Sequence, residues 1–198
     1  MQTALPVRLG FRENLNGITA SRGGRLALAL SANALLVICA HASVPLFFTP
    51  IPLTLQTFAV VLTGLLLGPS LALSATLLYL AEGAMGLPVF SPAGVGGAMQ
   101  LFGISGGFLM SYPVAAAGAG FIVRAFGSRF SRFGAAIVAG TAATVVILLC
   151  GGLWIGHLSQ SNWQTTATIG VVPFLPGEVI KIIAAAGAYA SLRRFVKE

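Results

Sequence analysis

The sequence predicts an all-α integral membrane protein with six transmembrane helices and both termini in the cytoplasm. Apolar residues make up 57% of its 198 residues, only 8% are charged, and the mean hydropathy is +0.94. Soluble domains carry about 25% charged residues, so this composition cannot build a surface that faces water. It excludes a soluble enzyme, a nucleic-acid-binding protein and a disordered chain, and leaves a multi-pass membrane protein of one domain.

Most of the charged residues lie outside two long apolar blocks of the sequence. From 26 to 123 the single formal charge is Glu82, and from 133 to 192 there are only Glu178 and Lys181. The other basic residues flank these blocks: Arg8, Arg12, Arg22, Arg25, Arg124, Arg129, Arg132, Arg193, Arg194 and Lys197. Basic clusters beside apolar segments indicate membrane topology, not a phosphate-binding surface, so no nucleic-acid partner is expected.

Turn-forming residues divide the apolar blocks into six segments. The proline-rich stretch 45–52 cannot be helical, 68–70 is a tight Gly-Pro-Ser turn, and 85–105 is rich in Gly and Pro. A span needs about 20 apolar residues, or fewer where the helix lies inside a bundle. The segments are Leu26–Val44, Leu53–Leu67, Leu71–Ala84, Gly106–Val123, Gly134–Ile155 and Gly170–Leu192.

Six segments place both termini on one side of the membrane. The basic residues that flank the apolar blocks then all fall on that side, whereas the loops 45–52, 85–105 and 157–169 contain no Lys or Arg. The positive-inside rule makes the basic side cytoplasmic. We therefore expect a short basic cytoplasmic segment over 1–25 and a single six-helix membrane domain over 26–198, surrounded by lipid in a bacterial plasma membrane.

Three ionisable residues lie within or at the edge of the apolar segments, where a charge costs several kcal/mol unless it is paired or hydrated. Glu178 and Lys181 are three positions apart on one face of the last helix. If that helix starts at Pro176, Glu178 lies in its first turn, where the helix dipole favours a carboxylate. Glu82 lies at the outer end of the third segment. The structural alternative is a self-neutralising Glu178–Lys181 pair with Glu82 reaching water.

The outer loops beside these residues predict a ligand pocket that opens away from the cytoplasm. A few polar groups in an apolar lining are typical of small-molecule sites. The aromatic residues that accompany the loops are Phe47, Phe48, Phe90, Phe102 and Phe174. The sequence contains neither G-x-x-x-x-G-K-[ST] nor H-E-x-x-H. We therefore expect a protein that is not an enzyme and that needs no metal or other cofactor.

Three stretches of the chain resemble the signature stretches of one family. They are PIPLTLQTFA (50–59), YLAEGAMGLPVF (79–90) and PFLPGEVIK (173–181). In this order and spacing they resemble BioY, the biotin-specific substrate-capture (S) component of energy-coupling-factor (ECF) transporters. The resemblance implies an S-component-like six-helix fold and an outward-facing biotin site. It also implies partners, namely a transmembrane coupling subunit and ATPase subunits that supply ATP hydrolysis.

The chemistry of biotin fits the residues of these stretches. Its ureido ring offers two N–H donors and one carbonyl acceptor; carboxylates can accept from it, and Lys181 can donate to it. Gln56 and Tyr79 add neutral contacts, and aromatic rings cover the carbon skeleton. The expected substrate-binding residues are Gln56, Tyr79, Glu82, Phe90, Phe174, Glu178 and Lys181. For the carboxylate of biotin, no outer loop supplies a Lys or Arg.

Other functions and partners fit the same sequence. One alternative is an autonomous secondary transporter of biotin or a related vitamin, coupled to protons through Glu178 and Lys181. Another keeps the S-component architecture but binds a different vitamin. Small residues at four-residue spacing, such as Ala116/Gly120 and Ala184/Ala188, allow helices to approach closely. They serve packing within the chain or, alternatively, docking of a partner subunit or a second copy.

Overall fold

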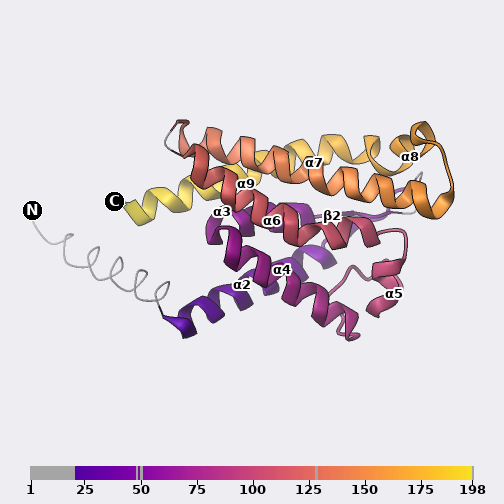
Figure 1. Cartoon of the computed structure of the whole chain (residues 1–198), viewed down its shortest axis with the longest axis horizontal. Helices are drawn as coiled ribbons and strands as arrows, with labels where there is room; N and C mark the ends of the chain where they lie inside the picture. The colour runs from indigo at the N-terminus through magenta and orange to yellow at the C-terminus, as the bar shows by residue number, and fades with distance from the viewer. Residues whose placement is uncertain (1–20, 48, 50, 128, 198) are drawn as a thin grey trace, which may run out of the picture.

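The computed structural model describes residues 21–47, 49, 51–127 and 129–197, in which helices predominate (Figure 1). Each predicted segment corresponds to one long helix. These helices are α2 (Arg22–His41), α3 (Gln56–Leu67), α4 (Pro69–Ala84), α6 (Gly106–Phe126), α7 (Arg132–Ser159) and α9 (Leu175–Lys197). Most of the predicted N-terminal segment lies outside the described residues.

The length and composition of the helices fit a membrane protein. Four helical stretches are long and apolar enough to cross a membrane: α2, α6, α7 and the stretch Trp163–Arg194, which includes most of α9. The helix α3 is apolar but shorter. All-helical architecture is therefore confirmed, with four candidate spans established by these criteria.

Short elements occupy the loops between the long helices. The strands β1 (Ser43–Val44) and β2 (Leu53–Thr54) pair antiparallel, with Ser43 opposite Thr54. The sequence predicted only helices and loops, because two-residue strands are too short to show an alternating pattern. Further short helices are α5 (Gly97–Phe102), α8 (Trp163–Gly170) and the 3-10 helix η1 (Val172–Phe174).

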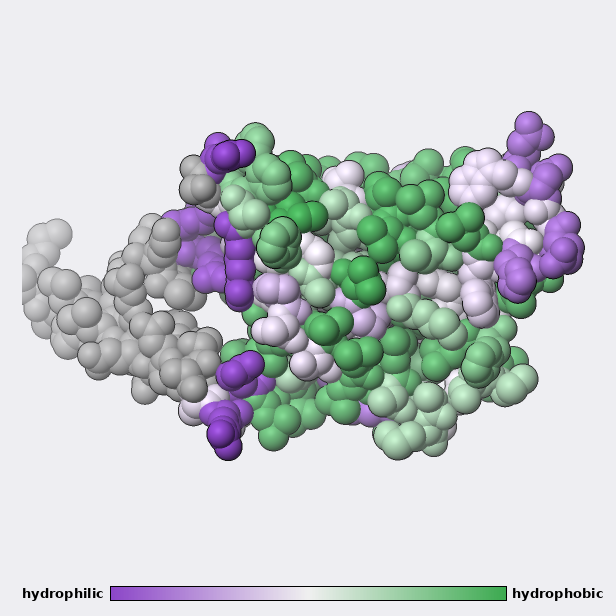
Figure 2. Space-filling model, viewed as in Figure 1, coloured by the Kyte–Doolittle hydropathy of each residue, from purple (hydrophilic) through white to green (hydrophobic). Residues whose placement is uncertain are grey.

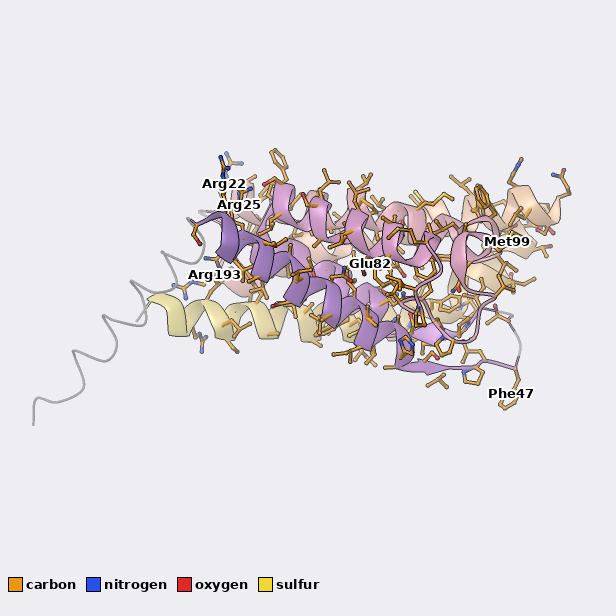
Figure 3. The ribbon with its side chains drawn as sticks, turned by 90° about the horizontal axis from the view of Figure 1, so that it is seen from below. Arg22, Arg25, Phe47, Glu82, Met99 and Arg193 are labelled. Carbon is orange, nitrogen blue, oxygen red and sulfur yellow. The ribbon has the colours of Figure 1, made fainter. Side chains whose placement is uncertain are left out.

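The long helices run side by side along the long axis of the molecule (Figure 1). Arg22, Arg25 and Arg193 lie at one end, and Phe47 and Met99 at the other (Figure 3). Hydrophilic residues gather at both ends, and apolar residues cover most of the surface between them (Figure 2). This apolar belt is the surface expected of a bundle whose long axis crosses a bilayer.

The helix α3 lies at the centre of the bundle. It contacts α2, α4, α6, α7 and α9, and nine of its 12 residues are buried. Its short length follows from this position, because a helix enclosed by protein need not span the hydrocarbon layer itself. Its first turn, which includes Gln56 and Thr57, is therefore positioned by the longer helices around it.

Glycines let α3 and α4 lie directly against α6. A Cβ on Gly120 of α6 would come 2.6 Å from the carbonyl carbon of Gly68 and 2.8 Å from the carbonyl oxygen of Gly64. These neighbours are backbone atoms, which cannot move aside as a flexible side chain can. The Ala116/Gly120 pair therefore serves packing within the chain. In contrast, a Cβ on Gly118 of the same helix would meet no atom within 4 Å.

We expect Gly120→Ala to destabilise the protein and Gly118→Ala not to. Forcing a methyl group into a packed interface costs roughly 1–3 kcal/mol, whereas alanine favours a helix over glycine where space is open. Thermal unfolding of both variants in the same detergent measures the difference. Equal melting temperatures for Gly120→Ala and the wild-type protein would contradict the close packing of α6 on the α3–α4 turn.

Candidate ligand-binding site

A cavity lies between the helices at the end of the bundle that carries α5 and the β1–β2 hairpin. It contains about 730 Å³ of empty space, counting its open mouth. Its walls come from the segment 51–57, the loop 91–105, α6, α7 and the first turns of α9. Residues from across the sequence therefore meet at one place.

The polar floor of the cavity joins α3 to α9. Lys181 Nζ lies 2.7 Å from Glu178 Oε1 and donates to Thr57 Oγ1 at 3.0 Å. Thr57 Oγ1 in turn donates to Glu178 Oε1 at 2.9 Å. Glu178 lies in the first turn of α9, as predicted, and the i, i+3 spacing brings Lys181 onto the same face. Both charged residues are buried, with 3% and 7% of their surface exposed.

One oxygen of this floor has no partner among the described residues. Glu178 Oε1 accepts from both Thr57 and Lys181, but the buried Oε2 accepts no hydrogen bond from any residue that the structure describes. An unsatisfied buried acceptor is costly, and more so when it is charged. Lys181 also has three protons, of which Thr57 and Glu178 take two. The floor can therefore bind a ligand group that combines a donor with an acceptor.

A second group of polar side chains forms a wall around Gln56. Gln56 Nε2 donates to Tyr79 Oη at 2.6 Å, and Tyr79 Oη donates to the carbonyl of Val89 at 3.1 Å. Gln56 Oε1 accepts from Thr54 Oγ1 at 3.2 Å and from Tyr112 Oη at 3.4 Å. Gln56 lines the cavity, whereas Tyr79 does not. The role of Tyr79 in this geometry is to fix the orientation of the Gln56 amide.

Aromatic and aliphatic side chains make up most of the remaining lining. Phe174 and Phe108 approach with ring centroids 6.3 Å apart, and both line the cavity. The Phe108 ring occupies the space above Gly151 of α7, which a Cβ there would fill. Leu148 and Ile104 add aliphatic surface. A flat apolar ring system can therefore pack against these aromatic rings above the polar floor.

The other predicted aromatic residues lie elsewhere. Phe90 packs edge-on against Tyr79 at 5.4 Å and sits above Gly83 of α4, so it supports the Gln56 wall from behind. Phe47 and Phe102 are exposed, and Figure 3 shows Phe47 at the end of the molecule. Phe48 lies outside the described residues.

The structure separates Glu82 from the other charged candidates. Asn33 Nδ2 of α2 donates to Glu82 Oε2 at 2.8 Å, and Glu82 does not line the cavity. In Figure 3 Glu82 lies between the two ends of the molecule. It is neither paired with Lys181 nor fully exposed at the surface. Glu178 and Lys181 therefore form the charged part of the cavity without it.

Sequence reasoning missed several residues of the cavity. Thr54 and Thr57 line the cavity and lie inside the PIPLTLQTFA stretch, so their position in that stretch could have predicted both of them. Tyr112, Phe108 and Gln100 lie in or before α6 and have no such signal, because isolated residues of these types are common in apolar helices. Among the described residues, no group of three His, Cys, Asp or Glu side chains could hold a metal ion.

The chain is similar to several known proteins. The chain is 33% identical to the biotin transporter BioY of Thermotoga maritima over 77% of this chain and 86% of that protein. It is 34% identical to the biotin transporter BioY of Rhodobacter capsulatus over 71% of this chain and 77% of that one. The crystal structure of the S-component for biotin from an ECF-type ABC transporter matches with a TM-score of 0.78.

That structural match has 26% sequence identity and covers 86% of this chain and 90% of the other. The model of the BioY family matches residues 13–198, which is nearly the full chain. This chain belongs to the BioY family.

Proposed function

We propose that this protein captures biotin as the S-component of an ECF-type transporter in the plasma membrane of a bacterium. The observation that carries the proposal is the buried floor of Glu178, Lys181 and Thr57 at the base of an apolar cavity. It leaves one carboxylate oxygen without a partner among the residues that the structure describes. Relatives named as biotin transporters and the matching biotin S-component support it. The protein itself is a binding subunit and not an enzyme.

The ureido ring of biotin matches the free groups of the floor. One N–H of the ureido ring donates to Glu178 Oε2. Lys181 Nζ donates its third proton to the ureido carbonyl. Phe174 and Phe108 pack against the fused rings, and Gln56 borders them. Tyr79 and Phe90 act through Gln56, which they hold in place. Glu82 takes no direct part, because it binds Asn33 outside the cavity.

Replacing Lys181 by Met should weaken biotin binding by roughly 10- to 150-fold, the equivalent of ~1.5–3 kcal/mol for a hydrogen bond to a charged group. Methionine keeps most of the volume of the stem but removes the donor. Isothermal titration of biotin into monodisperse protein measures the loss. Wild-type affinity in Lys181→Met would mean that the ion pair is structural and not part of the site.

Two matched Glu→Gln variants test whether Glu178 or Glu82 contacts the ligand. Glu178→Gln leaves a single amide oxygen for three donors, namely Thr57, Lys181 and the ring N–H, so biotin affinity should fall at least tenfold. Glu82→Gln should leave it within about twofold, because the amide can still accept from Asn33. Biotin titrations of the two proteins decide this. A loss of biotin affinity in Glu82→Gln greater than twofold would mean that Glu82 belongs to the binding site.

The same proposal includes energy coupling by partner subunits. The sequence has no phosphate-binding loop, so a transmembrane coupling subunit and ATPase subunits would supply ATP hydrolysis, and the chain would need no cofactor. Purified protein should bind biotin without nucleotide and hydrolyse no ATP. ATPase activity that co-purifies with the protein through successive steps would contradict this. Biotin uptake that an uncoupler abolishes but that survives deletion of the ATPase subunits would favour proton coupling.

We also propose six membrane-spanning helices with both termini in the cytoplasm, one membrane domain over 26–198, and the cavity open to the outside. The clustering of arginines at the end opposite the cavity supports this orientation. In a cysteine-free background, the exposed positions Val95→Cys and Gln164→Cys should react with an impermeant thiol reagent in intact cells, and Arg129→Cys should not. The reverse pattern would invert the topology.

A further inference from the structure

A second cavity lies beside the first and contains a histidine. It has about 410 Å³ of empty space, counting its opening, and His41 at the end of α2 forms part of its wall. Ser91, Gly94 and Gln100 line both cavities, so one stretch of chain, 91–100, forms the partition between them. The proposed recognition of the ureido ring uses only the first cavity and leaves the second without a function.

The partition between the cavities is thin. Gln100 is buried, and its Oε1 accepts from the backbone N–H of Gly96 at 3.1 Å. Its amide lies so close to Gly94 that a Cβ on this glycine would come 2.5 Å from Gln100 Nε2. Gly96 and Gly97 have φ angles of 72° and 61°, which only glycine adopts without strain. This loop therefore holds one polar side chain, that of Gln100, in the lining that the two cavities share.

Charge at this end of the molecule is scarce. The loops 42–55 and 85–105 contain no ionisable residue. Besides the buried Lys181, which pairs with Glu178, His41 and His157 are the residues near this end that can become positive, and His157 lines neither cavity. Of the other titratable groups on neighbouring helices, Cys39 of α2 is buried and Glu82 of α4 binds Asn33.

The hydrogen bond of His41 determines what its ring can offer. Its Nδ1 lies 2.9 Å from the carbonyl of Val37, and because a carbonyl only accepts, Nδ1 carries a proton. In the neutral ring Nε2 is then an acceptor, and it becomes a donor only when the ring gains a second proton. The exposed His41 can therefore bind an anion through Nε2 only in its charged form.

We propose that His41 binds the carboxylate at the end of the ligand's side chain, in the second cavity. This rests on the proposed function, in which the ureido ring occupies the floor of the first cavity. The chain of the ligand passes the partition formed by Ser91, Gly94 and Gln100, and its carboxylate accepts from Nε2 of the protonated His41. Binding of the anionic ligand is then linked to protonation of the His41 ring.

The test compares biotin with its methyl ester, which has the same ring but no negative charge. Both are titrated into wild-type protein, His41→Gln and the control His157→Gln at pH 6 and pH 8. Because His41 is exposed, biotin should bind about two- to fivefold more tightly to wild type at pH 6 than at pH 8, the scale of a solvent-exposed ion pair. His157→Gln should retain this difference.

His41→Gln should bind biotin with the same affinity at both pH values, because its amide does not change charge, and the methyl ester should bind wild type and His41→Gln with no difference between the two pH values. Any pH effect on biotin affinity that arises from Glu178 or Lys181 would persist in His41→Gln. The difference in pH effect between wild type and His41→Gln therefore measures the contribution of His41. A pH effect on biotin that is equal in His41→Gln and wild type, or its absence from wild type, overturns the proposal for His41. Failure of wild type to bind biotin at either pH overturns the proposed function instead.

Discussion

The ion pair between Lys181 and Glu178 is the interaction on which the site depends. Two buried charges inside an apolar bundle persist only where they pair and where further hydrogen bonds satisfy them. Here the further partner is the Thr57 hydroxyl, which accepts from Lys181 and donates to Glu178. Because Thr57 lies in the first turn of α3, the pair requires that turn to face the first turn of α9. The central position of α3 meets this requirement.

The orphaned oxygen of Glu178 argues for a ligand site over a purely structural ion pair. A structural pair gains most when every lone pair and proton is satisfied. Glu178 Oε2 instead remains buried without a partner in the described part of the chain, while the Asn33–Glu82 contact outside the cavity shows that this bundle can supply amide donors to carboxylates. A ligand that brings its own N–H donor offsets this cost. A ligand without such a donor leaves the cost in place, which is a basis for specificity.

The sequence predicted those features that depend on composition and on helical periodicity. The six helices occur where apolar segments end in Gly and Pro, and Glu178 and Lys181 share a face because they are three residues apart. Contacts between helices could not be predicted in the same way. Tyr79 and Glu82 are also three apart on α4, yet Tyr79 binds Gln56 of α3 and Glu82 binds Asn33 of α2. Only the packing of α4 between those two helices separates their roles.

The arrangement of hydrogen bonds also couples the site to helix packing. Thr57 is held by two residues of α9, and Gln56 beside it is held by Tyr79 of α4 and Tyr112 of α6. Two successive residues of α3 therefore connect the cavity to three other helices. A shift of α3 relative to α9 would break both hydrogen bonds of Thr57 and expose the floor to solvent or to mismatched partners. Retention of the ligand thus requires the packed arrangement, and its release is favoured by any partner that binds a different arrangement more tightly.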